Sequence, residues 1–299
     1  MRLDSDGDSS SNSPSNQHHQ QYLSSSLSSS EQPLSSLPRF KTAYSDIEDK
    51  RRSRRRILTF DIEKIDSFIS LTIADCVCIV SDERKYTNTI LMRLCVRSLM
   101  SKRQGGFEST NVIFVDAGGT CSDVYQCVNF ARQYGLNIKK VLQNIMVTRA
   151  FTIYQLADLL IYELPRVIQQ QFDGNAGVVV IADLLNLFTK DPSIDRDEAI
   201  SLIKEIICSL KKTENTLVVV SFQQQQQHQN KSYAYDKILL PRFDKRIEIT
   251  NNSRNGNINI LDVKIYNNNY NHSKDCNRSL LLKERDLLII PTPSWDFPT

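Results

Sequence analysis

The stretch that most constrains the fold is residues 112–151. It opens with the apolar, β-branched run VIFV, continues through the turn DAGGT, and carries an amphipathic segment that Gly135 closes. This order of residue types predicts a buried strand, a turn and a helix. In open α/β sheets, ligands bind outside the carboxyl ends of the strands. The DAGGT turn is therefore the first place to expect a functional site.

The N-terminal part of the chain has a different composition. Residues 1–38 contain runs such as SSSNSPSNQ and SSSLSSS and few apolar residues, and residues 39–56 are highly charged. A segment like 1–38 cannot bury enough surface to offset its chain entropy, so we expect a disordered tail followed by a basic linker. There is no apolar core of a secretory signal and no run of 18 apolar residues. We therefore expect a cytoplasmic protein without a membrane partner, associated with the nucleoid if it binds DNA.

Residues 57–292 alternate between apolar runs and amphipathic segments, and residues 293–299 form a short tail. The alternation predicts an α/β fold with a mostly parallel sheet and helices on both faces. From residue 237 onward the pattern changes to short runs between Asn-rich turns, which indicates an antiparallel extension at the sheet edge. We predict strands in that extension at KRIEIT, INILDVKIY and DLLIIP. The long helix of residues 152–172 is expected to kink at Pro165.

The cysteines and histidines do not indicate a metal site. The seven cysteines are scattered, and none forms a C-x-x-C pair with matching histidines. His272 and Cys276 are four residues apart but have no companion ligands. We expect reduced, mostly buried cysteines and no bound metal.

Six segments, in order along the chain, resemble parts of the RecA/RadA-type recombinases. They are ILTFDIEKID, CVCIV, VIFVDAGGT, VTRAF, VVVIADLLNLF and VVVSFQQ. The resemblance implies a RecA-like P-loop NTPase fold. It also implies that Asp183 stands at the magnesium-associated position of the Walker B strand and that Gln223 stands at a sensor glutamine. The catalytic glutamate of the family falls on Gly118.

The resemblance places the phosphate-binding loop at residues 81–88, where the chain departs from the family pattern. A phosphate cradle needs glycines that expose backbone amides, a lysine and a hydroxyl for magnesium. Here there is no glycine, and Tyr86 and Thr87 replace the glycine–lysine pair. The degenerate nucleotide site would comprise Ser81, Lys85, Tyr86, Thr87, Asn88, Asp116, Gly118, Asp183 and Gln223.

The loss of both the cradle and the glutamate argues against ATP hydrolysis by the usual mechanism. We expect no catalytic residue and no cofactor, and we leave residual binding of ATP with magnesium open. Asp116 and Asp183 are interpreted first as acids that cap turns at strand ends, with magnesium binding as the alternative. An active ATPase with an unconventional phosphate loop is the least favoured hypothesis.

Two segments are candidates for binding single- or double-stranded DNA. Clustered arginines attract phosphate backbones, and basic residues interleaved with aromatics suit single strands. The candidates are Arg51, Arg52, Arg54, Arg55 and Arg56 in the linker, and Lys231, Tyr233, Tyr235 and Lys237 in the segment QQQQQHQNKSYAYDK. The alternatives are a solvated linker or a site for an acidic protein in the first case, and a disordered glutamine tract in the second. The loop at residues 189–195, which would be the family's other DNA loop, is net acidic.

A docking motif is the remaining candidate. Phe40 and Ala43 fit the F-x-x-A pattern by which RadA-like recombinases dock onto a neighbouring core through an added edge strand. Only two residues are fixed, so the pattern also arises by chance. The resemblance as a whole implies a recombination or DNA-repair accessory protein that binds DNA, an active recombinase or itself. The alternative is a RecA/KaiC-like signalling or scaffold protein with no DNA role.

Overall fold

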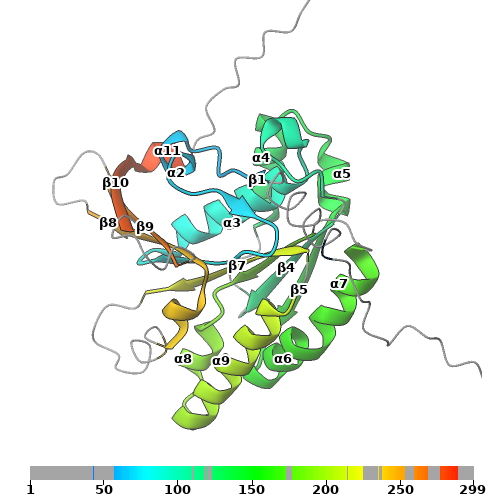
Figure 1. Cartoon of the computed structure of the whole chain (residues 1–299), viewed down its shortest axis with the longest axis vertical. Helices are drawn as coiled ribbons and strands as arrows, with labels where there is room; N and C mark the ends of the chain where they lie inside the picture. Colours follow the sequence, from blue (N-terminus) through cyan, green and yellow to red (C-terminus); the bar gives the residue numbers. More distant parts are fainter. Residues whose placement is uncertain are drawn as a thin grey trace, which may run out of the picture. The chain divides into compact units, whose positions relative to one another are not determined.

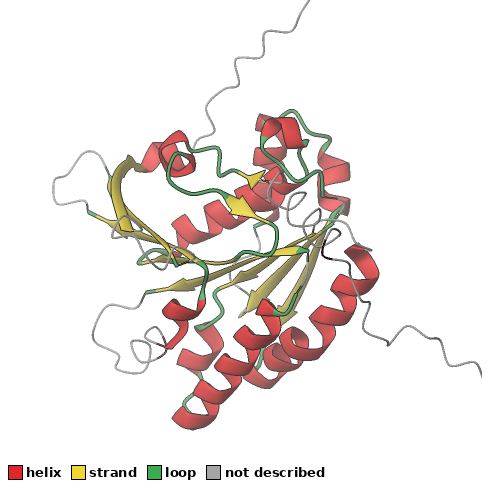
Figure 2. Cartoon of the chain, in the orientation of Figure 1, coloured by secondary structure: helices red, strands yellow, loops and turns green. Residues whose placement is uncertain are grey.

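The computed structural model describes most of the chain after the basic linker (Figure 2). The described residues are 43, 57–109, 111–117, 119, 123–172, 177–213, 215–224, 235, 238–252, 259–268 and 277–288.

An eight-stranded sheet with the order β10-β9-β8-β3-β7-β6-β4-β5 organises the core (Figure 1). The strands are β3 (Cys76–Ser81), β4 (Val112–Ala117), β5 (Ile145–Ala150), β6 (Gly177–Ala182), β7 (Thr216–Gln223), β8 (Lys245–Asn251), β9 (Ile260–Asn267) and β10 (Asn277–Lys283). All pairings from β8 through β5 are parallel, whereas β9 pairs antiparallel with both β8 and β10. The predicted α/β class, with a mostly parallel sheet and an antiparallel C-terminal edge, is confirmed.

Helices cover both faces of the sheet (Figure 1). One face carries α2 (Glu63–Asp66), α3 (Arg84–Ser98), α4 (Val124–Gln133), α5 (Ile138–Gln143) and α11 (Glu284–Leu288). The other carries α6 (Ile153–Asp158), α7 (Leu164–Phe172), α8 (Asn186–Lys190) and α9 (Arg196–Lys211). Short elements complete the fold: the β1–β2 ribbon (Ile57–Leu58, Leu71–Thr72), two 3₁₀ turns (Lys102–Gln104, Leu240–Arg242) and a π-helical turn (Leu159–Glu163). Within the described part, no helix is long and apolar enough to cross a membrane.

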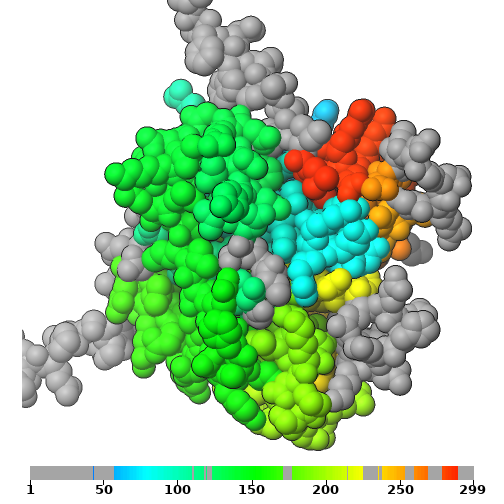
Figure 3. Space-filling model, turned by 180° about the vertical axis from the view of Figure 1, so that it is seen from behind, coloured from blue at the N-terminus to red at the C-terminus, as the bar shows by residue number. Residues whose placement is uncertain are grey.

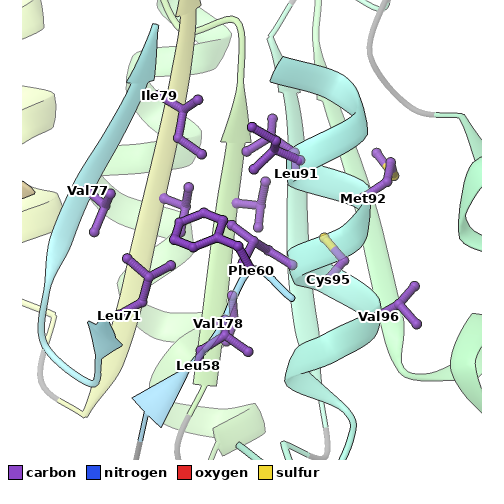
Figure 4. Packing of buried hydrophobic residues seen from close by; sticks show 14 of the residues in the cluster. Leu58, Phe60, Leu71, Val77, Ile79, Leu91, Met92, Cys95, Val96 and Val178 are labelled. Atoms are coloured by element: carbon purple, nitrogen blue, oxygen red, sulfur yellow. The ribbon is translucent and has the colours of Figure 1, made fainter. Parts of the chain in front are cut away.

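The two faces of the sheet belong to two separate hydrophobic clusters. Alternate residues of each strand point to opposite faces, so Val77 and Ile79 of β3 pack under α3, whereas Cys78 and Val80 pack toward the α6–α9 side. Phe60, from the loop after β1, lies between α3 and the strands (Figure 4). A sheet covered on both faces explains the near-continuous apolar runs of its central strands.

The C-terminal extension differs from the prediction. The run KRIEIT forms β8, but it pairs parallel with β3, so the antiparallel part begins one strand later. The strand predicted at DLLIIP is wrong, because residues 286–288 belong to α11 and the residues after 288 lie outside the described part. The third strand is instead β10, whose residues from Arg278 to Leu281 are exposed or half-buried. Such a half-solvated edge strand lacks the apolar run that marks a buried one.

The helix around Pro165 deviates just before the proline. A five-residue π-helical turn, Leu159–Glu163, joins α6 to α7. Proline has no N–H for the carbonyl four residues earlier, which is that of Ile161. The hydroxyl of Ser209 on α9 lies 3.4 Å from that oxygen and 3.2 Å from the oxygen of Leu160. A neighbouring side chain thus satisfies the carbonyls that the proline disturbs.

Candidate functional site

The carboxyl ends of the parallel strands bring several of the predicted site residues to one edge of the sheet. Ser81 at the end of β3 is in register with Gln223 of β7. Asp183 follows β6 directly, and Asp116 lies near the end of β4, the strand next to β6. This edge is the candidate functional site.

The connection from β3 to α3 is too short for a phosphate loop. β3 ends at Ser81 and α3 begins at Arg84, so only Asp82 and Glu83 lie between them. A phosphate cradle needs several consecutive backbone amides that face the ligand, and glycines that allow the chain to curve around it. Two acidic residues without glycine provide neither. Residues 84–88, placed in that loop by the family resemblance, form the start of the helix instead.

The side chains of the β3–α3 segment are engaged in internal contacts. The Tyr86 hydroxyl donates to Glu284 Oε1 at 3.1 Å, and the ring is fully buried. The Thr87 hydroxyl donates back to the Arg84 carbonyl at 2.9 Å, and the Ser81 hydroxyl accepts the Glu83 amide at 3.2 Å. Asn88 Oδ1 is buried and has no hydrogen-bond partner. The hydroxyls that could have faced magnesium therefore serve the fold.

The turn itself is held from two neighbouring strands. Gln223 Nε2 donates to the Asp82 carbonyl at 3.0 Å. The backbone amide of Asn251 at the end of β8 donates to Asp82 Oδ2 at 2.8 Å, and the Asn251 side chain donates to Glu83 Oε1 at 2.7 Å. The sensor-position glutamine thus fixes the short turn.

An ion pair joins the start of α3 to the end of β6. Arg84 Nη2 lies 2.6 Å from Asp183 Oδ2, and the two side chains are 32% and 7% exposed. Arg84 Nε finds no acceptor, and the attraction between the two side chains is mainly Coulombic. It brings a positive charge directly onto the carboxylate that the resemblance assigns to magnesium.

Asp183 is held in an uncommon backbone conformation. Its φ is 59°, in the left-handed region that aspartate and asparagine tolerate better than most residues. The Asp183 amide donates to Ser221 Oγ at 3.0 Å, and the Leu184 amide donates to the Ser221 carbonyl at 2.9 Å. Burial raises the pKa of the Asp183 carboxyl, and the Arg84 guanidinium opposes that rise. The arginine therefore favours the charged form of a carboxylate that its surroundings disfavour.

A second ion pair covers the other strand-end acid. Asp116 is fully buried, and its Oδ2 lies 3.3 Å from Arg149 Nη2 on the neighbouring strand β5. The arginine belongs to the VTRAF segment. Both acids that the sequence marked as possible magnesium ligands thus face a guanidinium.

A third set of contacts ties α3 to the C-terminal edge. Lys85 Nζ lies 2.9 Å from Glu284 Oε1 and 3.0 Å from Glu83 Oε2. The hydrogen bond with Glu284 raises the pKa of Lys85, the same contact lowers the pKa of Glu284, and burial raises the pKa of Tyr86 to about 12. Figure 3 shows the C-terminal segment against the region of α3. These four side chains hold the first turn of α3, which the resemblance had placed in the phosphate loop.

One of the DNA-binding candidates is buried. Tyr235 is 2% exposed and belongs to the hydrophobic cluster on the α6–α9 face, so its ring is not available for base stacking. The polar sequence around Tyr235 suggested an exposed side chain, but its aromatic ring packs into an apolar cluster. The loop at residues 189–195 also uses its acids internally, because Asp191 accepts the Ser193 amide and Asp195 caps α9.

The other predicted site residues lie outside the described part. They are Phe40, Arg51, Arg52, Arg54, Arg55, Arg56, Gly118, Lys231, Tyr233 and Lys237. Ala43 is described as an exposed helical residue, but its neighbours are not, so the docking motif stays a prediction.

This core matches a known protein family. The chain matches the Rad51 family model over residues 52–234, which is more than half of its length. The chain belongs to the Rad51 family. No curated protein matches it. Membership confirms the RecA-like fold and makes the protein recombinase-related, in agreement with the order of the six segments.

The Rad51-family core implies ATP and magnesium, but the residues present do not fit them. The β3–α3 turn has two residues and no glycine, and both strand-end acids are paired with arginines. In the described part of the chain, no group of three histidine, cysteine or acidic residues could hold a metal ion.

Five residues of this site were missed or left without a role by the sequence. They act through contacts with residues remote in the chain, so no local pattern marks them: Arg84, Arg149, Ser221, Asn251 and Glu284. The usable signal was the VTRAF segment, because a strand that ends there beside the DAGGT strand carries Arg149 to the same edge of the sheet. Parallel neighbours end at the same edge, and this alone could have placed Arg149 near Asp116.

Proposed function

We propose that this Rad51-family protein is an accessory factor in recombination or DNA repair that works without hydrolysing ATP. It binds DNA, an active recombinase, or both. The observation that carries the proposal is the two-residue β3–α3 turn with Arg84 on Asp183. A Rad51-family core with that turn keeps the surfaces of the fold but lacks the cradle that phosphoryl transfer needs.

Partner docking is supported by the free edge of the sheet. Among the described residues, β5 pairs only with β4, and its outer edge leaves Val147 52% exposed. Phe151, directly after the strand, is 69% exposed. An added strand from a partner would satisfy backbone groups along this edge and cover apolar surface. A second copy of this chain or a recombinase carrying an F-x-x-A segment fits that chemistry.

Docking through Phe40 is tested by co-purification with an active recombinase and by the oligomeric state. We expect Phe40→Ala to abolish the association, because the phenyl ring supplies most of the buried apolar surface of such a motif. Tyr44→Ala is the matched control, since it removes a neighbouring aromatic outside the pattern. Equal losses in both variants would contradict docking through the motif.

DNA binding is tested by the salt dependence of retention on single-stranded DNA. We expect neutralisation of the five linker arginines to weaken binding and to lower the magnitude of the slope of log K against log[salt] by up to about 3.5. The matched control neutralises five exposed basic residues of the core instead: Arg132, Lys139, Lys140, Lys204 and Lys212. No retention of the wild-type protein at low salt would contradict a DNA role.

A scaffold or signalling role without DNA is the second candidate. It is favoured by the buried Tyr235 ring and by the acidic loop at residues 189–195. The two functions are separated by the same experiment. Absence of DNA binding together with capture of a recombinase-free partner complex would select the scaffold.

A further inference from the structure

The two acids at the strand ends, Asp116 and Asp183, have different surroundings. Asp116 is fully buried beside Arg149, whereas Asp183 projects from a left-handed turn toward the start of α3. A buried carboxylate is stable in a protein only when a cation, a metal or hydrogen bonds compensate it. For Asp183, the main compensating charge is the guanidinium of Arg84, with Oδ2 2.6 Å from Nη2, and the backbone of Gln223 and the charge of Lys190 contribute less.

Arg84 is placed on Asp183 by contacts on both sides of it. Glu83 before it is bonded to Asn251 on β8, and Lys85 after it pairs with Glu284 at 2.9 Å. Tyr86, in the same turn, donates to the same glutamate. These contacts fix the first turn of α3 directly above the end of β6. The position of Arg84 is thus fixed by the contacts of its neighbours.

We propose that Arg84 takes the place of a divalent cation on Asp183, so that the sheet edge is held in one state that needs neither metal nor nucleotide. The positive charge comes from the chain, and the short β3–α3 turn brings it there. The inference rests on the proposed function only in treating the core as non-hydrolytic. Loss of DNA or recombinase binding would leave it unaffected.

If Arg84 stands in for a divalent cation, a cation should be able to replace it when it is removed. Removing Arg84 uncovers a carboxylate at a position where a hydrated divalent cation can replace the lost charge. Magnesium commonly binds proteins through one or two carboxylates while keeping several of its waters. The stability of an Arg84 variant should therefore respond to magnesium, whereas the stability of the wild-type protein should not.

The test is thermal unfolding of the full chain with and without about 10 mM MgCl2 or MnCl2, in the absence of nucleotide. We expect the midpoint of the wild-type protein to stay within about 1 °C. The midpoint of Arg84→Ala should be lower, and the cation should raise it by about 2 to 4 °C. In the double variant Arg84→Ala/Asp183→Asn, the cation response should disappear, because the carboxylate that holds the ion is gone.

Lys102→Ala is the matched control, because it uncovers the carboxylate of Glu108 in an exposed ion pair that takes no part in holding Arg84. An equal cation response in Lys102→Ala would overturn the proposal, as would a response of the wild-type protein or none in folded Arg84→Ala. Should Arg84→Ala not fold, Arg84→Gln replaces it and the same response is expected. Arg84→Lys retains a positive charge, and a cation response in that variant would also contradict the proposal.

Discussion

Replacing Arg84 should cost more stability than replacing its partner. In Arg84→Ala, the Asp183 carboxylate, 7% exposed, is left without the charge 2.6 Å away. Removing one partner of a buried pair costs about 3–5 kcal/mol, and the 32% exposure of Arg84 lets water offset part of this loss. We expect about 2–3 kcal/mol, which for a domain of this size lowers the unfolding midpoint by about 4–10 °C.

Asp183→Asn is the milder change. Asparagine tolerates the left-handed φ of 59°, and the half-exposed guanidinium left behind can be hydrated. We expect a loss of about 0.5–1.5 kcal/mol. In the double variant, the loss should resemble that of Asp183→Asn alone, so the coupling energy should equal the cost of Arg84→Ala, about 2–3 kcal/mol.

The assay is urea unfolding of the wild-type protein, both single variants and the double variant, followed by circular dichroism. The linear extrapolation gives the free energy of unfolding of each protein, and the cycle gives the coupling. Additive losses, with a coupling energy near zero, would refute the reasoning. They would mean that water or another group already compensates Asp183.

Three further outcomes are expected. The stability deficit of Arg84→Ala should be full at pH 7 and shrink toward pH 4. Burial raises the folded-state pKa of Asp183 and the arginine no longer opposes this rise, so the stability of the variant falls as pH rises. A deficit independent of pH would contradict this. Tyr235→Ala should cost about 3–5 kcal/mol in urea unfolding while Tyr235→Phe costs under about 1, and neither should change the DNA affinity of the folded protein. Lys245→Met should cost about 3–5 kcal/mol, because it leaves the Asp75 carboxylate, 8% exposed, without its cation. The double variant Lys245→Met/Asp75→Asn should recover part of the loss, and no recovery would argue against a stabilising ion pair.

The central strands could be predicted because they are buried on both faces. Residues of β3, β4, β6 and β7 are nearly all apolar, and each run is bounded by turn or helix signals. The strand β10 and the helix α5 were missed, since both are short and partly exposed. Their positions are set by pairing and packing with elements elsewhere in the chain, and a local pattern does not carry that information.

The start of α3 shows the same limit at the site. Glu83 occupies the N-cap position, but its side chain makes no capping hydrogen bond, so the usual signal of a helix start is absent. The resemblance placed residues 84–88 in the phosphate loop, and no capping signal contradicted that placement. Missing glycines revealed that the phosphate cradle was lost, but only the structure showed that Arg84 reaches Asp183.

The central claim is that the core does not use ATP, and titration of the wild-type protein with magnesium–ATP tests it most directly. Calorimetry and a phosphate-release assay should show no saturable binding up to about 1 mM nucleotide and no turnover. The linker arginines can attract ATP by charge alone, so a weak, salt-sensitive signal that persists in Asp183→Asn is not evidence of the site. Saturable, magnesium-dependent binding with turnover that Asp183→Asn abolishes would contradict the account.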